Sequence, residues 1–190
     1  MPRAGLTRER VIEQAAAVAD EAGLEHLTLA AVARRCGVSL PGLYKHVDGL
    51  EDVKRDIGLR AVRELTGLLA AAAVGVSGHE ALTEFARAYR AYARLHPGYY
   101  SAILHAPPPG DDEYEVAAAN AVSVVAAALK EYRLEGEALI HAVRILRAAF
   151  HGIVSLETAD GFGLPESVDD TYAHLIDALD IAFRSLGAGA

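Results

Sequence analysis

Residues 27–47 (LTLAAVARRCGVSLPGLYKHV) constrain the fold of this chain more than any other segment does. Val32 and Cys36 are four residues apart, which places them on one face of a short helix. Gly37 follows directly, and glycine commonly ends a helix because it tolerates a positive φ. Ser39 can then cap a second helix through its hydroxyl group. The segment therefore predicts two short helices joined by a tight turn.

The second helix of this pair is too short to be stable by itself. It contains Pro41 and Gly42, both poor helix formers, so packing must hold it in place. Leu43 and Val47, four residues apart, supply the packed face, and the opposite face is small and polar beside the arginine pair at 34–35. An ordinary helical hairpin of a bundle would show the same buried pattern. A helix-turn-helix that enters the major groove of DNA also explains the polar face.

The N-terminal third of the chain resembles a known family. Residues 7 to about 60 are similar to the N-terminal domain of the tetracycline-repressor (TetR) family of bacterial transcription regulators. The run Leu-Tyr-Lys-His at 43–46, which follows Gly-Val-Ser at 37–39, is the most diagnostic part of the match. The other matching residues include Thr7, Ile12, Ala15, Ala16, Gly23, Thr28, Leu29, Val32 and Ala33.

The resemblance implies that the segment 27–46 binds double-stranded operator DNA. Residues 40–42, at the front of the short helix, are candidates for contacts to base edges, and Tyr44 and Lys45 are candidates for phosphate contacts. In one respect the chain departs from the family pattern, because Leu50 stands where such proteins often carry a phosphate-contacting lysine. The complete set of candidate DNA contacts is Thr28, Arg34, Arg35, Ser39, Leu40, Pro41, Gly42, Tyr44, Lys45 and His46.

Composition and periodicity indicate an all-α fold of about nine helices. Apolar residues make up 52% of the chain, but aromatic residues make up only 6%, which suits close-packed helices better than a β-sandwich. We expect a helix-turn-helix head at 1–50, with the family-type domain extending to about 64, and a helical ligand-binding and dimerisation domain at 51–190. A helix from Asp48 to about Ala73 joins the two, with unbroken helical spacing.

The net charge of −8 first argues against a nucleic-acid partner. Residues 1–50, however, hold six basic and six acidic side chains, so the remainder holds 12 basic against 20 acidic. A neutral head with local arginines can bind phosphates, and an acidic body would be repelled from DNA. The uneven charge supports a division into two domains.

The middle helices carry candidate ligand-binding side chains. Tyrosine and histidine combine an apolar ring with a polar tip, and small-molecule sites are apolar pockets with a few polar anchors. The alternative is that each of them is a core residue with its polar atom bonded locally. The body also resembles the TetR C-terminal type named for a Trp-His-Gly motif, with Phe150-His151-Gly152 in that place. The candidates are Tyr89, Tyr92, His96, Tyr100, His141, Phe150 and His151.

The last helix has an apolar stripe that would either plug the core or pair with a second subunit. The resemblance favours pairing, since the last two helices of each TetR-family monomer form a four-helix interface. A twofold dimer also suits two DNA half-sites. The candidate interface residues are Val154, Tyr172, Leu175, Leu179, Ala182 and Phe183.

The sequence contains no motif typical of an enzyme. It lacks a phosphate-binding glycine loop, a His-Glu-x-x-His site, paired cysteines and a Gly-x-Ser-x-Gly elbow, so we expect neither catalysis nor a metal or cofactor. The single cysteine fits a reducing cytoplasm, and we expect no membrane partner. The leading hypothesis is a homodimeric, ligand-responsive repressor with an unidentified small-molecule effector. The alternative is a helical binding or scaffold module that no longer reads DNA, which the Leu50 departure and the acidic total charge would support.

Overall fold

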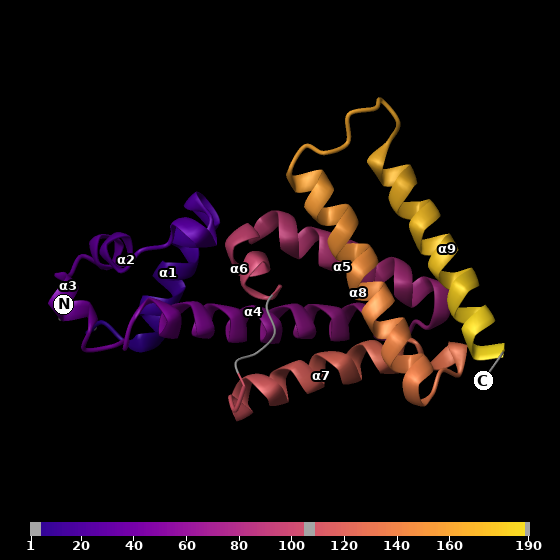
Figure 1. Cartoon of the computed structure of the whole chain (residues 1–190), viewed down its shortest axis with the longest axis horizontal. Coiled ribbons are helices and arrows are strands. Elements are labelled where there is room, and N and C mark those ends of the chain that lie inside the picture. Colours follow the sequence, from indigo (N-terminus) through magenta and orange to yellow (C-terminus); the bar gives the residue numbers. More distant parts are fainter. Residues whose placement is uncertain (1–4, 105–108, 189–190) are drawn as a thin grey trace. The chain divides into compact units, whose positions relative to one another are not determined.

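The computed structural model describes residues 5–104 and 109–188 (Figure 1). All regular structure in these residues is helical, which confirms the predicted all-α fold. The helices are α1 (Arg8–Ala22), η1 (Leu24–His26), α2 (Leu29–Cys36), α3 (Leu40–Leu43), α4 (Leu50–Ala72), α5 (Gly78–Leu95), α6 (Pro97–Ala102), α7 (Asp112–Ala128), η2 (Lys130–Tyr132), α8 (Gly136–Thr158) and α9 (Val168–Ala188), where η marks a short 3-10 turn.

The chain forms two compact units that interleave along the sequence. The first unit comprises residues 1–64 and 95–117, and the second comprises residues 65–94 and 118–190. The long helix α4 is continuous and contributes residues to both. These units are defined by packing. The expected functional division into a head at 1–50 and a body at 51–190 is a separate question and stays a prediction.

Helix α1 forms the centre of the first unit. Thr7 caps its first turn by accepting a hydrogen bond from the Arg10 N–H at 3.2 Å. At its other end α1 packs against α6, where Gly98 lies so close to the backbone of Ala19 that a Cβ atom would collide with it. The carboxylate of Asp20 also accepts a hydrogen bond from the Gly98 N–H at 2.8 Å. Because free N–H groups at a helix start attract acidic groups, Asp20 of α1 caps α6 from outside that helix.

The second unit is a helical bundle with aromatic side chains at its centre. The ring of Phe150, in α8, lies 5.8 Å from that of Tyr89 and 6.4 Å from that of Tyr172, measured between centroids. At another place the rings of Tyr132 and Phe183 meet edge to face at 5.6 Å. Edge-to-face and tilted contacts of this kind add to the stability that burial provides.

Helix α8 is apolar enough to require a test against a membrane span. By length and composition alone it could cross a bilayer, with a mean hydropathy of 1.4 over its most apolar window. It nevertheless carries exposed Arg144 and Arg147, and its buried residues, which include Leu146, Phe150 and Val154, belong to the core of the second unit. Helix packing therefore explains one face of the apolar stretch, while Ile140, Ile145 and Leu156 remain exposed.

Candidate nucleic-acid interface

The predicted helix-turn-helix is present as α2, a tight turn and α3. Gly37 ends α2 in the left-handed conformation, with φ at 70°. Its N–H donates to the carbonyl of Arg34 at 3.2 Å, and the next N–H, of Val38, donates to Ala33 at 3.0 Å. This pair of hydrogen bonds is a Schellman motif, which satisfies the last carbonyl groups of the helix. The turn angle therefore follows from the glycine.

Helix α3 is only four residues long and depends on its cap and on packing. The hydroxyl of Ser39 accepts a hydrogen bond from the Gly42 N–H at 3.3 Å, and Pro41 lies in the first turn, where a missing N–H costs nothing. Leu43 is fully buried, and Val47 is almost so. The buried residues fix one face of α3, which leaves the opposite face at the surface.

Several of the predicted DNA contacts lie on this exposed face. Leu40 and Tyr44 are 39% and 53% exposed, and Pro41 and Lys45 are exposed as well. In the described part of the chain neither Lys45 nor Arg34 has an ion-pair partner, so their charges are open to phosphates. Exposed cations can bind phosphates while the helix beside them enters the major groove, as the helix-turn-helix prediction expects.

Four other predicted DNA contacts make hydrogen bonds within the protein. Thr28 and Ser39 use their hydroxyls as helix caps, at α2 and α3 respectively. Arg35 donates to both carboxylate oxygens of Glu21, at 2.7 and 2.8 Å, which neutralises its charge. His46 is half-buried, and its carbonyl accepts a hydrogen bond from Arg8 at 3.1 Å. As DNA contacts, these four residues, the exposed ones and half-buried Gly42 all stay predictions.

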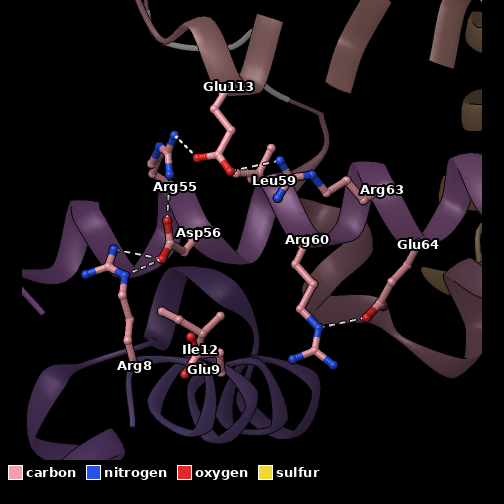
Figure 2. Close-up of a pocket in the computed structure, with 10 residues that line it drawn as sticks. All are labelled: Arg8, Glu9, Ile12, Arg55, Asp56, Leu59, Arg60, Arg63, Glu64 and Glu113. Carbon is pink, nitrogen blue, oxygen red and sulfur yellow. Dashed lines mark hydrogen bonds and ion pairs between the residues drawn. The ribbon is translucent and has the colours of Figure 1, made fainter. Parts of the chain in front are cut away.

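An ionic network that the sequence analysis missed lies beside this surface. Arg8, in the first turn of α1, bonds to Asp52 at 2.6 Å and to Asp56 at 2.8 Å, both in α4 (Figure 2 shows the Asp56 bond). Arg55 joins Asp56 to Asp111, which it holds through two bonds of 2.6 Å each. The hydrogen bonds that Arg8 donates to Asp52 raise the pKa of Arg8, and the Arg55 guanidinium lowers the pKa of Asp111 to about 2.

The same network borders an open pocket of about 410 Å³ in the first unit (Figure 2). Basic and acidic side chains alternate around it, and Arg63 pairs with Glu113 at 2.8 Å across its rim. Its full lining is Arg8, Glu9, Ile12, Arg55, Asp56, Leu59, Arg60, Arg63, Glu64 and Glu113. None of the predicted ligand-binding residues lines this pocket, so it is not the predicted effector site.

The structure brings together only some of the predicted ligand-binding residues. Tyr89, Tyr92, Phe150 and His151 belong to the second unit, where Tyr89 and Phe150 are in ring contact. His96 and Tyr100 belong to the first unit, and His141 is exposed on α8. Burial, together with the charge of Arg147, lowers the pKa of His151, so this ring stays neutral at neutral pH.

The predicted interface residues are largely covered by their own chain. Val154, Tyr172, Leu179 and Phe183 are buried, Leu175 is half-buried, and Ala182 is exposed. Tyr172 instead completes the aromatic group formed by Tyr89 and Phe150. The alternative that the α9 stripe plugs the core therefore applies to most of these side chains. A role for the buried ones in dimer formation stays a prediction.

Comparisons with known proteins agree with this geometry. Residues 11–48 match the family model described as bacterial regulatory proteins, tetR family, and residues 82–179 match the model described as tetracyclin repressor-like, C-terminal domain. A helix-turn-helix-type transcriptional regulator of Mycobacterium tuberculosis is 38% identical over 87% of this chain and 75% of its own length. The regulator YobS of Bacillus subtilis is 30% identical over 99% of this chain and 94% of its own length.

Solved structures share the fold over nearly the whole chain. A protein of unknown function from Rhodococcus matches with a TM-score of 0.78 and 20% identity over 95% of this chain and 97% of its own. A TetR variant from Acinetobacter baumannii, in complex with minocycline, matches with a TM-score of 0.62 and 19% identity over 97% and 96%. With its capped helix-turn-helix and its two family-model matches, the chain belongs to the tetracycline-repressor family of bacterial transcription regulators.

Proposed function

We propose that this regulator is a repressor that reads its operator with α3 and releases it when a small molecule binds the second unit. The observation that carries the proposal is the exposed surface of α3 and of the turn after it, where Leu40, Tyr44 and Lys45 lie together and Lys45 has no ion-pair partner among the described residues. The protein acts in the cytoplasm and by binding alone, without catalysis, metal or cofactor.

The residues of this surface divide into two kinds of DNA contact. Residues 40–42 contact base edges, because they lie at the start of the helix, the end that enters the groove in helix-turn-helix proteins. Tyr44 and Lys45 contact phosphates, which carry affinity but no sequence information. Arg34 adds a third phosphate contact from the end of α2.

The effector site lies among the aromatic residues of the second unit. Tyr89 and Phe150 are in ring contact there, and Tyr172 lies against Phe150. The Tyr172 hydroxyl is buried and has no hydrogen-bond partner in the described residues, so a ligand with a polar atom at that point would satisfy it. In the related Acinetobacter structure the TetR variant holds minocycline. An apolar effector with one suitably placed polar group therefore fits this region.

Regulation requires two conformations of the protein, one with high and one with low affinity for operator DNA. The effector must bind one of these conformations more tightly than the other. Helix α4 runs without a break from the first unit into the second, so it can transmit a tilt from the effector site to the reading surface. A differential affinity of about 1–3 kcal/mol would change operator affinity by roughly 5- to 150-fold. Operator DNA must then weaken effector binding by the same factor.

The experiment compares two duplexes by fluorescence anisotropy: the DNA upstream of the gene for this protein and a scrambled duplex of equal length and composition. We expect the upstream duplex to bind at least 10³-fold more tightly, as specific sites do. Leu40→Ala should reduce this preference, while Glu25→Ala, an exposed change away from α3, should leave it unchanged. Equal affinity of the wild type for both duplexes would favour the scaffold alternative.

A further inference from the structure

We propose that Arg8 is a positioning residue for operator recognition, which fixes the end of the recognition segment without touching DNA. This inference rests on the proposed reading role of α3. Arg8 lies in α1, outside the segment 27–46, and among the described residues its guanidinium hydrogen-bonds that segment at the backbone carbonyl of His46. It differs from the proposed phosphate contacts because its charge is already matched by two carboxylates.

The need for such a residue follows from the shortness of α3. A helix of one turn has almost no stability of its own, so its direction is set by what holds its two ends. Ser39 caps the start, and buried Leu43 holds the packed face. Leu43 and, just beyond the segment, Val47 are buried, but apolar packing has no fixed direction and does not by itself orient the peptide groups between them. The carbonyl of His46, three residues after Leu43, is the point at which the far end is fixed.

The guanidinium of Arg8 fixes that far end by donating to four oxygen atoms of three residues at once. Nη1 donates to the His46 carbonyl at 3.1 Å and to Asp52 Oδ2 at 3.0 Å. Nη2 donates to Asp52 Oδ1 at 2.6 Å, and Nε donates to Asp56 Oδ2 at 2.8 Å. Asp52 in turn accepts a hydrogen bond from the backbone N–H of Asp48 at 2.9 Å. One side chain therefore joins α1, the end of the recognition segment and the first two turns of α4.

Only arginine can make this set of contacts. Its five N–H donors lie in one rigid plane, whereas the lysine ammonium is a point charge with a different reach. The acceptors are also arranged for it, because Asp52 and Asp56 are four residues apart and so share one face of α4. Both carboxylates are largely covered, with side chains 22% and 16% exposed, which limits screening by salt.

The network extends from this point to the start of α7. Arg55 bonds to Asp56 at 2.8 Å and to Asp111 through two bonds of 2.6 Å, and Figure 2 shows its contact with Glu113. Asp111 and Glu113 lie within the sequence matched by the C-terminal family model, yet they pack in the first unit. The position of the reading surface therefore depends in part on residues outside the DNA-binding family domain.

The test uses Arg8→Lys, with Arg10→Lys as the matched control. Arg10 is in the same helix turn, is exposed, and pairs only with Glu13 among the described residues. We expect Arg8→Lys to weaken binding to the upstream duplex by about tenfold, the scale of one charge-assisted hydrogen bond. Affinity for the scrambled duplex and the dependence of binding on salt should stay at the wild-type values, since no phosphate contact is lost. Arg10→Lys should match the wild type in every measurement.

A double-mutant cycle shows whether Arg8 acts through Asp52. Asp52→Asn should weaken binding to the upstream duplex by a similar factor, and the double variant should be no weaker than Arg8→Lys alone. If Arg8→Lys does not fold, Asp52→Asn and Asp56→Asn each remove one of the carboxylate charges that Arg8 binds, and the loss of operator affinity in the double variant should be less than the product of the two single losses. Fully multiplicative effects would overturn the proposal.

Other outcomes identify the competing roles of Arg8. Wild-type operator affinity in a folded Arg8→Lys variant would show that Arg8 only stabilises the fold. Equal weakening with both duplexes, together with a salt dependence smaller by about one counterion, would show a direct phosphate contact. Both results overturn the positioning role while the proposed function stands. A wild-type protein that binds the upstream and scrambled duplexes equally would overturn the positioning role of Arg8 and the proposed function together.

Discussion

Replacing Tyr172 with phenylalanine should stabilise this protein, although the change removes a polar group from a buried tyrosine. Tyr172 is 5% exposed, and its hydroxyl is a buried side-chain atom without a hydrogen-bond partner among the described residues. Burial without a hydrogen bond disfavours a hydroxyl, because the hydrogen bonds that it made to water in the unfolded chain are lost. The ring contacts do not involve the oxygen, so phenylalanine keeps them.

The magnitude follows from the cost of an unsatisfied polar group. Leaving a buried donor or acceptor unpaired costs about 1–3 kcal/mol, so Tyr172→Phe should gain up to this amount. For a chain of this size each kcal/mol shifts Tm by roughly 2–4 °C. Arg90 lies 4.9 Å from the centroid of the Tyr172 ring, and this cation–π contact should persist, since phenylalanine also presents a π face.

Tyr132→Phe is the matched control, with the opposite expected sign. Tyr132 is also buried, but its hydroxyl donates to Asp180 Oδ1 at 2.6 Å. Burial and this hydrogen bond raise the pKa of Tyr132, and burial raises that of Tyr172, so both are neutral at ordinary pH. Because hydrogen bonds to charged groups contribute about 1.5–3 kcal/mol, Tyr132→Phe should lower Tm.

Thermal unfolding at one fixed protein concentration, followed by circular dichroism, measures both variants. The fixed concentration matters because the Tm of a dimer depends on concentration. If Tyr172→Phe lowers Tm as much as Tyr132→Phe does, the Tyr172 hydroxyl has a partner, such as a trapped water molecule. The Tyr172 hydroxyl would then not be available to bind a polar atom of a ligand.

Three further predictions concern the first unit and α4. Lys45→Ala should weaken binding to the upstream and scrambled duplexes equally and reduce the salt dependence by about one counterion in titrations at several salt concentrations. Asp111→Asn should lower Tm at neutral pH, because it removes the ion pair with Arg55. Arg55 holds the pKa of Asp111 at about 2, below its ordinary value, so the ion pair stabilises the fold fully above about pH 4. The difference in Tm between the variant and the wild type should vanish as pH falls through 2. Gly98→Ala should destabilise the fold by about 1–3 kcal/mol in denaturant unfolding, since its Cβ would meet the α1 backbone, whereas Gly67→Ala, with open space around it, should be neutral or stabilising.

The helix-turn-helix was predictable because its determinants are local. Gly37, Ser39 and the spacing of Leu43 and Val47 act within a few residues of themselves, so the sequence shows them directly. Arg8 and its partners could not be found in this way. Asp52 and Asp56 lie 44 and 48 residues further along the chain, and a lone arginine in a first helical turn carries no signal for a distant partner. The spacing of Asp52 and Asp56 can be read from the sequence, but the cation that they bind cannot.

The effector region was predicted by residue type and only in part by position. Tyrosine and histidine occur on several helices, and helical periodicity does not say which of them face the same core. The structure groups Tyr89 with Phe150 and adds Tyr172, whereas His96 packs in the first unit, where it lies 3.6 Å from Asp20. Only the hydrogen bonds in the structure show whether the polar atom of each tyrosine or histidine already has a partner within the protein.

Helix α9 shows why a subunit interface cannot be inferred from an apolar stripe alone. A stripe of period 3.6 marks a covered face, but the cover can come from the same chain or from a partner. Leu179 is buried within its own chain, so Leu179→Glu would unfold the protein and not report on dimerisation.

The exposed apolar residues give the better test of the dimer. Ile181 is 69% exposed on α9, and Ile145 and Leu156 are 43% and 50% exposed on α8, which packs against α9 in the second unit. If α8 and α9 form the dimer interface, Ile181→Glu should place a charge in it at a cost of several kcal/mol and yield folded monomers in sedimentation. Leu164→Glu, at a site 78% exposed but outside both helices, should remain dimeric. A dimer that survives Ile181→Glu would place the interface on another face, because no apolar contact tolerates a buried, unpaired carboxylate at its centre.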